Sequence, residues 1–178
     1  MKKLTIYLLP LLMAVMMVGC SSDDDNFVYD PSAPNMLQIR DGGKSVSYQV
    51  TGGIFYVNQM LISEGPSIIF NCGLPEECGL SGLVIRIAKT PTNELEVGEI
   101  FQMNQFWANL TPRYEWFCGT AFVNNTRLTN GTIQVVDKKM KDGQDVLTLR
   151  LINVTFGEGE GSYVINGIVD FEYTGSMY

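Results

Sequence analysis

From Met36 to the end of the chain, hydrophobic and polar residues alternate in short runs that Gly, Asn and Asp turns separate. The last run is the clearest, because its apolar residues fall on one face and mostly polar residues fall on the other. The apolar face comprises Tyr163, Ile165, Val169, Phe171 and Tyr173. A repeat of two residues is typical of a β-strand with one buried face. The pattern therefore predicts a strand over residues 163–174.

Similar runs, rich in β-branched and aromatic residues, predict further strands. They cover residues 36–40, 44–50, 54–62, 67–72, 82–88, 97–103, 113–123, 132–136 and 146–156. In the last of these the apolar phase slips by one residue near Leu151 and Ile152, which predicts a β-bulge. The lysine-rich residues 138–143 are expected to form an exposed turn. About nine or ten strands joined by short turns predict an all-β domain, either an antiparallel β-sandwich or a barrel.

The N-terminal residues follow a different pattern. Lys2 and Lys3 precede an apolar stretch from Leu4 to Val18, which Pro10 interrupts. This stretch is too short to cross a bilayer as a stable helix. A short basic segment followed by an apolar one is typical of a secretory signal. We therefore expect residues 1–19 to be a signal peptide that is removed.

The end of this signal carries two short motifs. Met17-Val18-Gly19-Cys20 resembles the lipobox of bacterial lipoproteins, which implies lipid attachment at Cys20. The following Ser21-Ser22-Asp23-Asp24-Asp25-Asn26 resembles the export signal of surface lipoproteins in Bacteroidota-type bacteria. Together the resemblances imply a lipid anchor in the outer membrane, exposed at the cell surface, since two or more acyl chains anchor stably. The alternatives are an ordinary signal with an incidental cysteine, and aspartates that only keep the segment solvated.

Residues 20–35 are polar and acidic and include Pro31 and Pro34, so they are expected to form a lipidated, flexible tether. Residues 36–178 then make one domain, which is long enough to bury an ordinary core. Its C-terminal half has the rhythm Gly-x-Ile-x-Val from Gly131, Leu-x-Leu from Leu147 and Ile-x-Gly-x-Val-x-Phe from Ile165. This rhythm resembles small all-β, lipocalin-like or sandwich domains of unknown function on Bacteroidota-type lipoproteins. The resemblance implies a fold and a location but no activity.

Composition limits the chemistry. The 178 residues contain no histidine, which excludes Ser-His-Asp triads, Cys-His pairs and His-ligated zinc. The formal net charge of −7 argues against a nucleic-acid partner, which a basic surface would have to bind. We expect no cofactor, no metal and no enzymatic activity.

The cysteines predict one covalent link. With Cys20 lipidated, Cys72, Cys78 and Cys118 remain, and an exported domain permits disulfides. Cys72 and Cys78 flank Gly-Leu-Pro-Glu-Glu, so a bridge between them would close a small loop. Cys118 would then stay reduced inside the core. One of these cysteines acting as a nucleophile is the alternative, but it would need a base other than histidine.

One aromatic residue is a candidate for ligand contact. Trp107 lies in a segment that reads as a loop, between Asn104 and Asn109, whose amides could bind hydroxyl groups. A flat exposed aromatic ring can hold the apolar face of a sugar. The alternative is that Trp107 fills the core, as is expected of the aromatic residues of 113–123.

Three functions fit these observations. The first is a non-enzymatic β domain on the cell surface that binds a glycan, a small apolar ligand or a partner protein of the outer membrane. The second is a structural or accessory subunit of a surface assembly, which would present an open sheet edge. The third is a glycosidase that uses carboxylates alone, which needs two carboxylates about 5–10 Å apart in a cleft.

Overall fold

The computed structural model describes residues 34–58, 66–88, 94–112 and 128–177. Their regular structure is β, apart from short 3₁₀ turns, which confirms the predicted all-β class. The strands are β1 (Met36–Asp41), β2 (Lys44–Gln49), β3 (Gly53–Asn58), β4 (Ser67–Gly73), β5 (Leu80–Ala88), β6 (Ile100–Gln102), β7 (Phe106–Pro112), β8 (Leu128–Lys141), β9 (Gln144–Phe156) and β10 (Tyr163–Met177). The 3₁₀ turns are η1 (Glu76–Cys78), η2 (Met103–Gln105) and η4 (Gly159–Gly161).

Several predictions fall outside the described residues: the signal, Cys20, the tether as far as residue 33, the strand over 113–123 and Cys118. In the part of the chain that the structure describes, no helix is long and apolar enough to cross a membrane.

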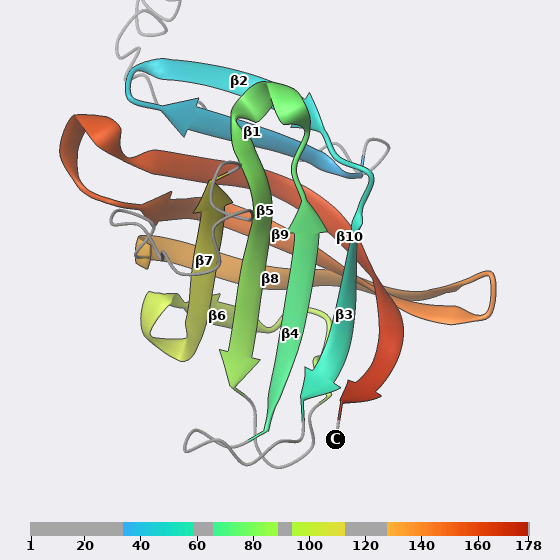
Figure 1. Cartoon of the computed structure of the whole chain (residues 1–178). Helices are drawn as coiled ribbons and strands as arrows, with labels where there is room; N and C mark the ends of the chain where they lie inside the picture. Colours follow the sequence, from blue (N-terminus) through green and yellow to red (C-terminus); the bar gives the residue numbers. More distant parts are fainter. Residues whose placement is uncertain (1–33, 59–65, 89–93, 113–127, 178) are drawn as a thin grey trace, which may run out of the picture.

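The strands form one sheet in the order β6-β8-β9-β10-β3-β4-β5-β7, which curls into a nearly closed barrel (Figure 1). Its two ends, β6 and β7, are neighbours in the chain and are joined by η2. The β1–β2 hairpin lies off this path and pairs with the first half of β10. This arrangement is consistent with the predicted lipocalin-like barrel or sandwich, but the sheet is mixed and not purely antiparallel as predicted.

One strand pairing is parallel, whereas every other pairing in the described sheet is antiparallel. The reason lies in the path of the chain. β2 runs in the same direction as β10 but is separated from it by β1. After Val50-Thr51-Gly52 the chain keeps the direction of β2 but shifts sideways to lie next to β10, so that Gly53 pairs with Phe171. β3 thus takes the place of β1 beside β10.

The predicted bulge in residues 146–156 is confirmed. Ile165 of β10 pairs with Val154, but Gly167 pairs with Leu151, so β9 carries one extra residue. Asn153 absorbs it with a left-handed φ of 48°, and its N–H donates to Asn166 Oδ1 at 2.7 Å. Gly167 has a φ of 145°, and a Cβ there would lie 2.9 Å from the Cα of Leu37. Glycine therefore allows β1 to approach β10 closely.

Inward-facing side chains fill the barrel. Phe70 packs edge-on against Phe171 with ring centroids 5.1 Å apart, and it stacks with Phe55 at 5.6 Å. Strands such as β4, β5 and β7 supply alternate apolar residues to this core, as the period-two pattern requires. The largest fully buried side chains are Phe70, Phe156, Phe171, Leu37, Ile68, Leu80, Leu83, Ile85, Ile87, Leu95, Leu110 and Ile133.

Three predicted boundaries are wrong. The strand predicted over 97–103 is limited to Ile100–Gln102, because residues 97 and 98 turn and Met103 begins η2. Residues 138–143 are not a turn, because β8 continues to Lys141 and only Asp142 and Gly143 turn. The lysines there extend the strand, and Lys139 and Lys141 form ion pairs with β10. Residues 106–109 are not a loop but the start of β7, in which Phe106 and Ala108 face the core. The sequence did not show this alternation, because Trp107 and Asn109 lie between the buried residues and asparagine is typical of turns.

Candidate functional site

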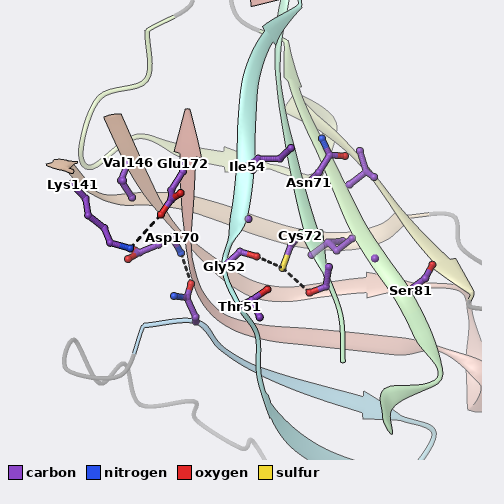
Figure 2. Close-up of a pocket in the computed structure, with 16 residues that line it drawn as sticks. Thr51, Gly52, Ile54, Asn71, Cys72, Ser81, Lys141, Val146, Asp170 and Glu172 are labelled. Carbon is purple, nitrogen blue, oxygen red and sulfur yellow. Dashed lines mark hydrogen bonds and ion pairs between the residues drawn. The ribbon is translucent and has the colours of Figure 1, made fainter. Parts of the chain in front are cut away.

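Two glycines face each other on the outer surface of the barrel. Gly73 of β4 pairs with Gly82 of β5, and the adjacent Cys72 and Leu83 point into the core. A Cβ at Gly73 would meet nothing within 4 Å. Because both positions lack side chains, the barrel wall is hollowed there, and the cavity has a volume of about 540 Å³. We call it the glycine hollow (Figure 2).

The lining of the glycine hollow is mixed. It combines amide and hydroxyl groups, apolar side chains, glycine backbone and one charged wall. Figure 2 shows the charged side chains on β8 and β10 facing the side chains of β3, β4 and β5 across the space. The lining residues are Asn35, Thr51, Gly52, Gly53, Ile54, Asn71, Cys72, Gly73, Ser81, Gly82, Leu83, Val84, Lys141, Val146, Asp170 and Glu172.

Both carboxylates of the charged wall are paired. Asp170 Oδ2 lies 3.0 Å from Lys139 Nζ, and its Oδ1 accepts a hydrogen bond from Thr148 Oγ1 at 2.6 Å. Glu172 Oε1 lies 3.2 Å from Lys141 Nζ. The Asp170 side chain is 16% exposed, whereas that of Glu172 is 45% exposed. The wall is therefore ordered at Asp170 and open to solvent at Glu172.

The lysines reach their partners diagonally across β9. Lys139 pairs in register with Val146, which in turn pairs with Glu172, yet the ammonium group binds Asp170 of the next row. The aliphatic stem of a lysine can cover apolar surface while its charged end stays solvated. Val146 is fully buried although it lies on the outer face. The two ion pairs thus build a continuous wall over β9.

Asn35 joins this wall to the β1–β2 hairpin. Its Oδ1 accepts a hydrogen bond from the Asp170 backbone N–H at 2.8 Å, and its carbonyl accepts one from the Val50 N–H at 2.8 Å. Asn35 has a left-handed φ of 67°, which asparagine adopts more readily than most residues. The start of β1, the end of β2 and the middle of β10 are therefore fixed relative to one another.

The predicted disulfide between Cys72 and Cys78 is not formed. Cys72 points into the barrel, and its thiol contacts the carbonyl oxygens of Gly52 and Gly73 at 3.8 and 3.5 Å. Cys78 ends η1, and its thiol donates to the Pro75 carbonyl at 3.0 Å. The 3₁₀ turn directs Cys78 to its own loop, so the short spacing does not bring the sulfurs together. Burial raises the pKa of the Cys72 thiol to about 12.

The structure separates the predicted ligand-contact residues. Trp107 lies on β7 with its side chain 52% exposed, so it does not fill the core. Asn109 is half-buried on the same outer face of β7, two residues further along. Asn104 is exposed in η2, before the strand begins. Trp107 and Asn109 therefore share a surface, and Asn104 belongs to a different element.

Sequence reasoning missed the glycine hollow. Its floor comes from Gly73 and Gly82, and its charged wall comes from residues that looked like parts of strands or of a turn. The sequence did contain one sign of it. Gly73 lies two residues from Asn71, and Gly82 lies two residues from Val84, so each glycine shares the outward face of its strand with a side chain. That signal identifies the hollow only when the register of β4 and β5 is known. Within the described ranges, no group of three or more Cys, Asp or Glu side chains is arranged to hold a metal ion.

Comparisons of this chain with protein-family profiles, with curated proteins and with solved structures gave no match. Fold and site alone define the class of this protein: an all-β, nearly closed barrel with a filled interior and a hollow of mixed polar and apolar lining on its wall.

Proposed function

We propose that this chain is a lipoprotein anchored by Cys20 in the outer membrane, at the cell surface, and that its barrel is a non-enzymatic module that binds a neutral glycan in the glycine hollow. The signal and lipobox residues support the anchor. The observation that carries the binding function is the facing pair of Gly73 and Gly82, which lies in a hollow lined by both polar and apolar groups.

The lining favours an uncharged, hydroxyl-rich ligand. Asn71 and Thr51 offer amide and hydroxyl groups, and Ile54 offers an apolar surface that is 44% exposed. Each carboxylate on the wall already has a lysine partner. A cation or an anion would have to compete with those ion pairs, whereas sugar hydroxyls can donate to the carboxylates and accept from the ammonium groups.

The other ligands considered from the sequence receive less support. A lipocalin-like site for a small apolar ligand would lie inside the barrel, where Phe70, Phe156 and Phe171 are fully buried in the core. A glycosidase needs one carboxyl group that donates a proton. Asp170 and Glu172 are instead each engaged by an ammonium group, which suits binding better than proton transfer.

The test is a screen of neutral and anionic glycans with the full chain purified in detergent. The Gly73→Leu variant places a side chain in the glycine hollow where a Cβ meets no atom. Gly43→Leu is the matched control, since a Cβ at Gly43 in the β1–β2 turn also meets nothing within 4 Å. We expect neutral glycans to bind the parent chain and the control but not Gly73→Leu. Unchanged binding by Gly73→Leu, or no neutral glycan bound, would contradict the proposal.

A second function, as an accessory subunit of a surface assembly, is favoured by one observation. Among the described strands β2 pairs with β1 alone, so its other edge has backbone groups available for strand addition. A photo-crosslinker at the exposed Ser45, used in intact cells, tests this function. A crosslinked product of one defined mass would support it, and only monomer would argue against it.

A further inference from the structure

The glycine hollow continues into a track of outward-facing side chains on β4, β5 and β7. Asn71 pairs in register with Val84, and Val84 pairs with Asn109. Arg86, two residues beyond Val84, pairs with Trp107. Side chains two residues apart on a strand lie on the same face. One uninterrupted face therefore leads from the glycine hollow past Val84 and Asn109 to Trp107.

Trp107 is held on this face by its neighbours in the chain. Phe106 and Ala108 are buried in the core, so the indole between them must point outward. Arg86, opposite Trp107, is itself positioned, because its Nε donates to Ser67 Oγ at 2.9 Å and Ser67 is fully buried. Trp107 thus points outward from the strand beside a positioned guanidinium group and is 52% exposed.

The spacing determines how long a ligand must be to use both ends of the track. Gly82 pairs with Thr111, and Trp107 lies four residues away on β7. With about 3.4 Å per residue along a strand and about 4.8 Å between strands, the backbones of Gly82 and Trp107 lie roughly 14 Å apart. A single sugar ring in the glycine hollow cannot reach Trp107. A short chain of rings can follow the track.

We propose that this site takes an oligosaccharide, with one ring in the glycine hollow and a later ring stacked on Trp107; this inference rests on the proposed function. The apolar C–H face of a pyranose ring packs against the indole. Asn109 and Arg86 flank this second position and can hydrogen-bond the hydroxyl groups at the edge of the ring. Binding then strengthens with ligand length up to the unit that meets Trp107.

The experiment measures the affinity of the full chain in detergent for neutral glucose oligomers, α-1,4- or β-1,4-linked, from the monosaccharide to the hexasaccharide. Parent, Trp107→Ala, Trp107→Phe and Gly73→Leu chains are compared by calorimetry. Val97→Ala is the control for loss of an exposed apolar side chain, since Val97 is 57% exposed in the turn before β6. Thermal unfolding of each variant checks that the barrel is intact.

We expect Trp107→Ala to weaken binding of the longer oligomers by about tenfold and to leave the shortest bound ligand unchanged. Trp107→Phe should keep most of the increase in affinity with oligomer length, and Val97→Ala should keep all of it. If Gly73→Leu abolishes binding but Trp107→Ala changes nothing, or weakens all lengths equally, the extended site is wrong while the proposed function stands. If the parent chain binds neither oligomer series, the oligosaccharide inference is overturned, and the wider glycan screen decides the proposed function separately.

Discussion

Phe171 of β10 lies against Gly53 of β3, across the single parallel pairing of the described sheet. A Cβ at residue 53 would overlap the Phe171 ring and would lie 2.6 Å from the Asn71 carbonyl oxygen. The glycine leaves room for the aromatic ring, and the ring fills the space that the missing side chain leaves. The step by which the chain enters the barrel wall therefore depends on this pair.

Replacing Gly53 with alanine should destabilise the barrel by roughly 1–3 kcal/mol, the usual effect of overfilling a packed core. Chemical denaturation of the purified chain measures the change. Gly43→Ala is the control, because a Cβ there meets no atom within 4 Å and Gly43 lacks a left-handed φ. Equal stability of Gly53→Ala and the control would show that the observed packing is not tight.

Asp170→Asn should destabilise the protein more than Glu172→Gln. Asp170 is largely buried and combines an ion pair with the Thr148 hydrogen bond, so losing its charge should cost about 1.5–3 kcal/mol. Lys141 and Glu172 are 59% and 45% exposed, and such surface pairs are worth about 0–1 kcal/mol. Denaturation at low and high salt compares the two variants. The expectation fails if Glu172→Gln is the more harmful change.

Asn153 offers a test of the bulge in β9. Its φ of 48° is left-handed, which costs most residues about 1–2 kcal/mol but costs glycine little. Asn153→Gly should therefore leave the thermal midpoint close to that of the parent, and Asn153→Val should lower it. A valine variant as stable as the glycine variant would mean that residue 153 does not carry the bulge.

The buried Cys72 thiol should make the barrel sensitive to alkali. Burial raises its pKa from 9.0 to about 12, so between those values the unfolded chain ionises while the folded chain stays protonated. The stabilising contribution is complete below pH 9 and is lost as the pH rises toward 12. We expect the free energy of unfolding to fall over this range.

Cys72→Ala removes that contribution and should flatten the alkaline decline. The comparison is necessary because burial, with nearby Asp41 and Cys78, also raises the pKa of Tyr163 above 10.0. Tyr163 remains in both proteins, so its effect cancels in the difference. Parallel declines in the two proteins would rule out Cys72 as the cause. A thiol reagent at neutral pH should also modify Cys72 only after unfolding.

Particular residues show which features of the fold the sequence pattern predicts and which it does not. Alternation placed the strand over 163–174 and its buried residues, because one face of β10 meets the core and the other does not. The slip at Leu151–Ile152 located the bulge for the same reason. Alternation failed at residues 138–141, where strand residues are charged because they form ion pairs with β10 rather than facing only water.

The sequence by itself determined the all-β class, nearly all of the described strands and the exclusion of histidine chemistry, since each follows from local pattern or composition. Only the tertiary structure decided that the sheet curls into a nearly closed barrel, that Cys72 and Cys78 stay apart, and that Gly73 and Gly82 face each other. These relationships depend on register between strands distant in sequence. A hollow made by missing side chains becomes visible only when the strands on either side of it are placed together.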